Sequence, residues 1–303
     1  MIKSITVTNY LGDVLEIDLM RPDLSGFVID SITGIGPGKA NINTTEVSTN
    51  DGSLYNSSRL PSRNIVLGLK YYGVDIETIR QTSYRYFPIK KKLKLLIKTD
   101  NREAEIEGYV ESNDPNIFSK REGSDISIVC PNPFFYSAGE KGKNTTVFYG
   151  VEHLFEFPFS NESLSACLLE LGAVRNQTEH VITYTGDSEI GVTIYIHAIG
   201  NVGNITIYNT GTRELMTIDA NKIEAFTGQG IVAGDDITIC TVKGSKSITL
   251  LRAGIEINIL NCLSKNTAWF QLAKGDNIFA YIADYGSTNL QFRIENRIIY
   301  EGV

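Results

Sequence analysis

The histidines and the paired aspartates are the residues of this chain that could bind a metal or move protons. His153, His180 and His197 could each be a metal ligand or a general base, but no two of them have the HExxH spacing of a zinc-binding helix. Each is therefore predicted to be a solvated or hydrogen-bonded strand residue. Asp235 and Asp236 lie between a glycine and an alternating segment, which favours a turn, because Ca²⁺ needs more oxygen ligands than this pair supplies. We predict no metal site.

Two short motifs resemble fragments of active sites. Residues 34–38, GIGPG, look like a phosphate-binding loop, but no helical pattern follows to supply the N–H groups that hold phosphate. Gly186, Asp187 and Ser188 look like the nucleophile segment of some esterases, which need a histidine base near the end of the chain, and none follows His197. Both segments are predicted to be turns. The sequence predicts a protein that is not an enzyme, without catalytic residues or a cofactor.

Lysines crowd the segment IKKKLKLLIK, at Lys90, Lys91, Lys92, Lys94 and Lys98. The favoured interpretation is an exposed strand face on which lysine blocks edge-to-edge aggregation. The alternative is an electrostatic contact with an acidic neighbour, including another copy of the chain. No stacking aromatics accompany the lysines, and the net charge is −7, so specific nucleic-acid binding is not expected. Residues 103–107 alternate Glu with Ala and Ile, as on the outer face of a strand.

Aromatic residues are plentiful in the second half of the chain, Trp269 and Tyr285 among them. Exposed on a β-sandwich, such rings could stack against sugars. In TAWFQLAKGDNIFAY at least one of Trp269 and Phe270 must face inward, so core packing is the favoured interpretation.

Strands are the elements that must position these residues. Of the 303 residues 42% are hydrophobic and 21% charged, which is ordinary for a folded protein with real cores. Short β-branched and aromatic runs alternate in polarity along the whole chain, with Gly, Asn and Asp between them. Phe155, Phe157 and Phe159 are expected on one side of such a strand. The fold is predicted to be mainly β.

One helix interrupts the strands. Asp75 is a suitable N-cap for a helix with Ile76, Ile79, Tyr86 and Phe87 on one face, ending before Pro88. We therefore expect a sheet domain with one helix in the first half of the chain and a purely β second half.

A domain boundary is predicted at CPNPFFY. The strand DISIVC should stop at Cys130, because Pro131 and Pro133 cannot donate ladder hydrogen bonds. Phe134, Phe135 and Tyr136 should then close the bottom of the first core. The predicted domains are residues 1–136 and 151–303, joined by a flexible linker over 137–150.

Nothing in the sequence directs export or membrane insertion. The start has no apolar signal core, and no apolar run approaches the roughly 20 residues that cross a bilayer. Cys130, Cys167, Cys240 and Cys262 are widely spaced and predicted to be reduced, buried thiols.

Read in order, the segments resemble the distal tail protein family of long-tailed bacteriophages, the siphovirus-type tail component. In the first half the resemblance is carried by GFVIDSITGIGPGKANI, RNIVLGLKYYGVDIETIR, GYVES and ISIVCPNPFFY. In the second half it is carried more loosely by FEFPFSNES, NITIYNTGTRELMTID, AWFQLAKGDN and YEGV. Each motif is weak by itself, but their order is fairly specific and spans nearly the whole chain.

The resemblance implies a structural role. It implies an N-terminal β-sandwich-like domain, with one helix and an extended hairpin, that forms a ring, commonly a hexamer. The ring caps the tail tube and joins it to the tip or baseplate. The C-terminal domain is implied to be a galectin-like β-sandwich that carries adhesion components. The implied partners are further copies of the chain, the tail tube protein, and a tail tip protein, tail-associated lysin or receptor-binding protein. The implied location is the virion tail tip, after synthesis in the bacterial cytoplasm.

Residues 36–62 are long, polar and poor in core residues. Such a segment is costly to order on an isolated subunit and is expected to settle as an extended hairpin against the next copy. The alternative function is a carbohydrate-binding adhesin that acts through the C-terminal sandwich, at Trp269 or Tyr285. A hydrolase is the third and least favoured interpretation.

Overall fold

The computed structural model describes residues 1–46, 48, 51–139, 143–148, 151–152, 173–174 and 179–303. The chain divides into two compact units. Unit 1 comprises Met1–Gly142 together with Ile299–Val303, and unit 2 comprises Lys143–Ile298. His153, Phe155, Phe157, Phe159 and Cys167 lie outside the described residues, so the predictions made for them stay predictions.

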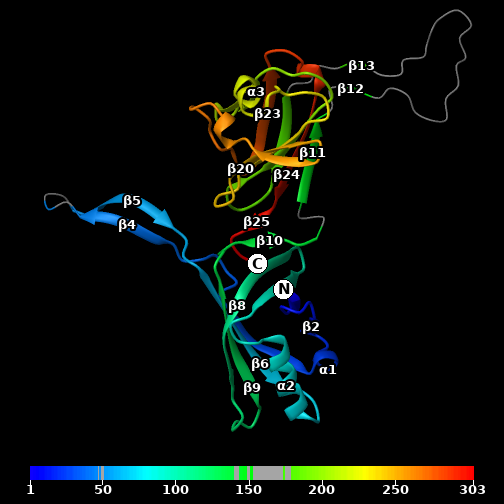
Figure 1. Ribbon diagram of the computed structural model, residues 1–303. Coiled ribbons are helices and arrows are strands. Elements are labelled where there is room, and N and C mark those ends of the chain that lie inside the picture. The colour runs from blue at the N-terminus through cyan, green and yellow to red at the C-terminus, as the bar shows by residue number, and fades with distance from the viewer. Residues whose placement is uncertain (47, 49–50, 140–142, 149–150, 153–172, 175–178) are drawn as a thin grey trace, which may run out of the picture. The chain divides into compact units, whose positions relative to one another are not determined.

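Unit 1 is built on one antiparallel sheet with strand order β2-β1-β7-β8-β9-β6-β3, to which β10 and β25 are joined (Figure 1). Its elements are β1 Ile2–Thr8, β2 Val14–Asp18, α1 Pro22–Ser25, β3 Phe27–Thr33, β4 Asn41–Glu46, β5 Ser53–Arg59, β6 Arg63–Tyr71, α2 Ile76–Tyr86, β7 Lys92–Thr99, β8 Glu103–Pro115, β9 Gly123–Cys130, β10 Phe135–Ser137 and β25 Ile299–Tyr300. Alternate residues of the strands form a single buried cluster, which includes Ile5, Ile65, Leu95 and Ile128. The sheet therefore encloses one core.

The predicted helix is confirmed as α2. Asp75 caps it, its carboxylate accepting a hydrogen bond from the Thr78 backbone N–H at 3.1 Å. Ile76, Ile79 and Tyr86 pack against the core of unit 1, and Phe87 is fully buried just after the helix. The apolar face is what fixes α2 to the sheet, since a helix of 11 residues is marginal by itself.

The end of β9 lies where the prolines predict it, at Cys130. Beyond it the Asn132 side chain accepts from the Phe134 N–H at 3.1 Å, which turns the chain. Phe135 is then fully buried in the core of unit 1, while Phe134 and Tyr136 are half-buried. Burial in this core also raises the pKa of the Cys130 thiol to about 11.

Two boundaries differ from the predicted domains. Lys143–Phe148, expected in a linker, form β11 and pair with β24 of unit 2. Ile299–Val303, expected in the second domain, belong to unit 1, where β25 pairs with β10 through Phe135–Tyr300 and Tyr136–Ile299. Both differences arise from long-range strand pairing, which local composition does not encode.

Unit 2 contains two larger antiparallel sheets, with strand orders β11-β24-β16-β19-β20-β21 and β14-β23-β17-β18. Its elements are β11 Lys143–Phe148, β12 Val151–Glu152, β13 Ala173–Val174, β14 Glu179–Tyr184, β15 Ile190–Gly191, β16 Thr193–Ala198, β17 Ile205–Asn209, β18 Glu214–Ile218, α3 Ala220–Thr227, β19 Asp236–Cys240, β20 Ser247–Arg252, β21 Ile255–Asn258, β22 Gln271–Leu272, β23 Gly275–Ala283 and β24 Leu290–Arg297, with short 3₁₀ turns at Leu260–Cys262 and Ser287–Asn289. Tyr281 of one sheet stacks on Phe292 of the other at 4.0 Å between ring centroids. The two sheets thus pack face to face as a sandwich.

The mainly-β prediction is confirmed, with 52% of the described residues in strands and 11% in helices. The purely β second half is wrong, because α3 lies between β18 and β19. Asp219 caps α3 by accepting from the N–H groups of Asn221 and Lys222, and Gly228 ends it in the left-handed conformation. Among the described residues no helix is long and apolar enough to cross a membrane.

Candidate functional site

The most distinctive surface of the molecule is a hairpin that leaves the sheet of unit 1. Within the described part of the chain, strands β4 and β5 pair only with each other, and all of their residues are exposed. Figure 1 shows the pair extending away from the rest of unit 1. We call residues 41–59 the arm. It coincides with the extended hairpin expected from residues 36–62.

The arm carries large apolar side chains that its own chain does not cover. Ile42, Leu54 and Tyr55 are 62%, 62% and 64% exposed. The Tyr55 hydroxyl lies 2.9 Å from the Ser58 hydroxyl, and Ser58 lies opposite Ile42, so Ile42 and Tyr55 share one face. A two-stranded hairpin is marginal in water, and burying each of these side chains would contribute about 1.5–3 kcal/mol. The arm therefore has the character of a docking element.

The root of the arm is organised by one buried cation, Arg63. Arg63 is only 7% exposed. Its guanidinium donates hydrogen bonds to four backbone carbonyl oxygens: those of Pro133 at 2.7 Å, Gly34 at 2.8 Å, Gly36 at 2.5 Å and Glu301 at 2.6 Å. The guanidinium carbon also lies 4.8 Å from the centroid of the Phe135 ring. These bonds join three segments that are far apart in the sequence.

Burial lowers the pKa of the Arg63 guanidinium from its ordinary value. Arginine remains charged at physiological pH, and the carbonyl dipoles replace the water that burial removes. Lysine could not do the same, since a point-like ammonium cannot reach several separate acceptors. The role of Arg63 is to hold the base of the arm at a fixed place on unit 1.

The returning residues 299–303 complete this root. The Val303 N–H donates to the Ile35 carbonyl at 3.0 Å, and Arg102 donates to the Gly302 carbonyl at 3.2 Å. A Cβ on Gly302 would come within 3.0 Å of Gly36 and Pro37, which shows how closely the two segments pass. The GIGPG motif is therefore a turn, as predicted, and its carbonyls serve Arg63.

The lysine-rich segment IKKKLKLLIK was predicted to protect a sheet edge, but its strand does not lie at an edge, so this prediction is wrong. Strand β7 is internal, paired with β1 on one side and β8 on the other. Lys92 and Lys94 form ion pairs with Glu107 at 2.8 Å and Glu105 at 2.5 Å across the β7–β8 ladder. Lys92 and Lys94 are thus paired with carboxylates of the neighbouring strand in the same chain.

The two adjacent aspartates have different roles. Asp235 is 1% exposed and accepts two hydrogen bonds from Arg252, at 2.7 and 2.5 Å, and a third from the Val232 N–H at 2.9 Å. Asp236 is exposed and pairs with His197 at 2.6 Å. Asp235 raises the pKa of Arg252 through this bidentate contact. Asp235 therefore closes the turn before β19. No cluster of three metal-ligating side chains occurs in the described part of the chain.

The remaining candidate residues are spread over unit 2. His180 lies in β14 opposite Phe279, and Ser188 accepts a hydrogen bond at its backbone carbonyl from the Tyr184 hydroxyl at 3.0 Å. Phe270 is buried against Phe279, as the core-packing interpretation required. Trp269 is half-buried beside Lys246, and Tyr285 is exposed. The structure does not gather these residues into one site.

Sequence reasoning missed Arg63. The available signal was an arginine in RNIVLGLKYY, at the start of an otherwise apolar strand and between two proline-containing segments. A charged residue in such a strand is buried only with dedicated partners. The acceptors of Arg63 are backbone carbonyls, which every residue has, so the sequence does not show which of them will bind the guanidinium.

Comparison with solved structures decides the fold. The chain aligns over 98% of its length with 100% of the SPP1 Dit (gp 19.1) protein, at a TM-score of 0.63 and 11% identity. The fold is that of Dit. SPP1 Dit is described as a paradigm of the hub adsorption apparatus in phages that infect Gram-positive bacteria. At 11% identity the likeness concerns the fold, and at that level it confirms the resemblance drawn from the sequence.

Chains of the phage P2 baseplate also match the Dit-fold chain. They come from the activated baseplate with Ca, at 12% identity and a TM-score of 0.46, and with Sr, at 11% identity and a TM-score of 0.47. The alignments cover 98% and 97% of this chain and 99% and 98% of the baseplate chains. No family model and no curated protein matches the sequence.

Proposed function

We propose that this Dit-fold protein is a structural component of a phage tail, which forms a ring between the tail tube and the tip or baseplate. The ring is proposed to contain six copies and to anchor host-adhesion components at the tail tip of the virion. Its work is docking, and no bond is made or broken on it. The arm is the observation that carries the proposal.

The arm supports a ring because it is an exposed apolar hairpin, which needs a different, complementary surface on the neighbouring copy to dock against. A ring grows from head-to-tail contacts, in which one patch of each copy meets a different patch of the next. The arm offers exposed apolar side chains and two unpaired strand edges, both suited to docking on a neighbour. Arg63 fixes the direction in which the arm leaves unit 1, so successive copies would meet at one angle.

Removing residues 44–58 tests the proposal. The wild-type chain should form annular particles in negative-stain microscopy and elute as a single large species with light-scattering detection. The deletion should give folded monomers, because the root and the core lie outside the deleted segment. Rings of normal size after the deletion would contradict the role of the arm.

A point variant sharpens this test. Ile42→Ser with Tyr55→Ser removes the apolar pair on one face, while Asn43→Ser with Ser57→Thr alters the other face and keeps its polarity. The first variant should weaken ring formation by at least tenfold in concentration, and the second should leave it unchanged. A chain that stays monomeric at every concentration, also beside its tube and tip neighbours, would refute the ring.

A further inference from the structure

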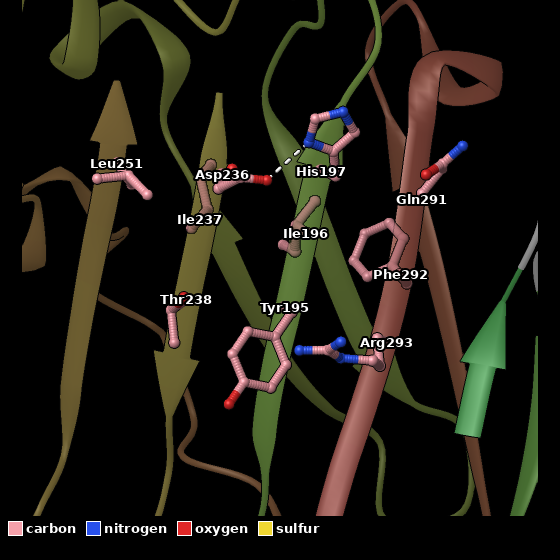
Figure 2. A pocket seen from close by; sticks show the side chains of 10 residues that line it. All are labelled: Tyr195, Ile196, His197, Asp236, Ile237, Thr238, Leu251, Gln291, Phe292 and Arg293. Carbon is pink, nitrogen blue, oxygen red and sulfur yellow. Dashed lines mark hydrogen bonds and ion pairs between the residues drawn. The ribbon is translucent and has the colours of Figure 1, made fainter. Parts of the chain in front are cut away.

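The six-stranded sheet of unit 2 carries a groove on the face opposite its core. Ile196, Ile237 and Phe292 are buried on the core side, and the residues next to them in each strand point outward. The groove has a volume of about 530 Å³. Figure 2 shows its outward side chains, which come from β16, β19, β20 and β24.

Strand register places the outward side chains in two adjacent rows. In one row His197 has Gln291 on one side and Asp236 on the other, with Leu251 beyond. In the other row Tyr195 lies between Arg293 and Thr238. Cross-strand partners lie about 4.5–5.5 Å apart at Cβ, so the two rows form a continuous polar surface with one aromatic ring.

Part of this surface is held in place by contacts within the chain. His197 Nδ1 lies 2.6 Å from Asp236 Oδ1, and the Arg293 guanidinium carbon lies 4.3 Å from the centroid of the Tyr195 ring. Arg293 is also paired with Glu295, Nε to Oε1, at 3.2 Å. The charged side chains are therefore oriented before any ligand arrives, which lowers the entropy cost of binding.

Other groups on the same surface have hydrogen-bonding capacity to spare. The Tyr195 hydroxyl, the Thr238 hydroxyl and the Gln291 amide have no hydrogen-bond partner among the described residues. They surround the oriented pairs and offer both donors and acceptors. The groove thus combines fixed charged groups with free neutral ones.

We propose that this groove binds a neutral saccharide through adjacent hydroxyl groups. Planar amide, carboxylate and guanidinium groups can each bond two neighbouring hydroxyls, and the Tyr195 ring offers an apolar face for sugar C–H groups. Arg293 is balanced by Glu295, and Asp236 adds a negative charge, so an anionic ligand is disfavoured. The volume lies in the usual range of small-ligand sites.

This site differs from the one that the sequence pointed to. Neither Trp269 nor Tyr285 lines the groove. The proposal also stands apart from the ring, because the groove lies wholly within unit 2 and the arm within unit 1. Failure of either proposal leaves the other intact.

The test uses the full chain on a printed array of neutral and acidic oligosaccharides, followed by calorimetric titration with the strongest neutral one. Gln291→Ala and Tyr195→Phe each remove one group that has no hydrogen-bond partner among the described residues. Each variant should weaken binding roughly fivefold, and the double variant at least tenfold. Gln229→Ala and Tyr285→Phe alter exposed residues of the same type outside the groove and should bind as the wild type does.

Three outcomes would overturn the proposal. They are the absence of binding to every neutral glycan at millimolar concentration, binding that is confined to acidic glycans, and neutral-glycan binding that Gln291→Ala and Tyr195→Phe leave unchanged. Far-UV circular dichroism of each variant shows whether a loss of binding reflects unfolding. Gln291 and Tyr195 point away from the core, so the variants are expected to fold.

Discussion

The root of the arm and the groove of unit 2 each place an arginine over an aromatic ring, and the two arginines are satisfied in opposite ways. Arg63 lies over Phe135, is buried, and donates to four backbone carbonyls of its own chain. Arg293 lies over Tyr195, has a side chain that is 47% exposed, and pairs with one carboxylate.

The difference in burial between the two arginines distinguishes polar groups that stabilise the fold from polar groups that remain available to a binding partner. A buried cation must have its hydrogen bonds met within the chain, or its desolvation is not offset. A half-exposed cation keeps its water and can exchange it for ligand groups. Substitutions at the root should therefore change stability, and substitutions in the groove should change binding.

The largest expected effect is at Arg63. Arg63→Ala leaves up to four buried carbonyls without a donor and should cost about 3–5 kcal/mol of unfolding free energy. Arg293→Ala should cost within about 0.5 kcal/mol. Urea unfolding measures both. The single tryptophan, Trp269, is in unit 2, so the Arg63→Ala loss should appear in far-UV circular dichroism and be absent from the fluorescence transition. Equal costs for the two variants would refute the distinction.

The adjacent aspartates repeat the comparison within unit 2. Asp235→Ala removes the bidentate partner of Arg252 and an acceptor for the Val232 N–H, and should cost about 2–4 kcal/mol. Asp236→Ala removes an exposed contact to His197 and should change stability by no more than about 0.5 kcal/mol. For these two variants the fluorescence of Trp269 should report the unfolding transition, because both aspartates and Trp269 lie in unit 2. A larger loss for Asp236→Ala would reverse the assignment of their roles.

Substitution of two glycines at the root of the arm is expected to have a smaller effect on stability. Gly34 has φ +80°, and a Cβ there would collide with the Asn64 carbonyl oxygen, whereas Gly36 has open space around it. Gly34→Ala should therefore destabilise unit 1 by about 1–3 kcal/mol, and Gly36→Ala by a few tenths at most. Thermal unfolding compares the two variants. Similar midpoints would show that the turn at the root is not constrained as described.

The smallest effect concerns the cap of α2. The Thr78 side chain and backbone donate to Asp75 and hold the pKa of its carboxyl below 3.8. A depressed pKa stabilises the folded state above the unfolded pKa, and this contribution is lost as pH falls through the folded value. The protection factors of the α2 amides, which correct for the intrinsic pH dependence of exchange, should therefore fall below about pH 4. Asp75→Asn keeps the acceptor without the charge and should remove this dependence, so an unchanged pH profile in that variant would contradict the cap.

Local signals in the sequence predicted several elements correctly. Asp75 and the apolar spacing of Ile76 and Ile79 predicted α2, and Pro131 predicted the end of β9. In each case the physical cause lies within a few residues. The helix α3 could also have been found, because Asp219 and Gly228 are a standard cap and stop around Ile223. Its eight residues lie between two alternating segments, and so short a helical pattern is difficult to distinguish from a strand.

Contacts between distant segments escaped the sequence for a different reason. The lysine strand was placed at an edge because alternation of charge does not identify the neighbours of a strand. The pairing of β11 with β24 and of β25 with β10 joins residues more than a hundred positions apart in the sequence. No local pattern records which edge a strand will meet.

The sequence by itself determined the mainly-β class, the helix with its cap, and the presence of a polar segment too poor in apolar residues to join a core. These follow from periodicity, proline chemistry and composition, which act over short distances. Only the tertiary structure decided that Arg63 ties the arm to residues 299–303, and that Tyr195, His197, Gln291 and Arg293 share one surface. Both depend on backbone carbonyls and strand register, which exist only once distant parts of the chain have paired.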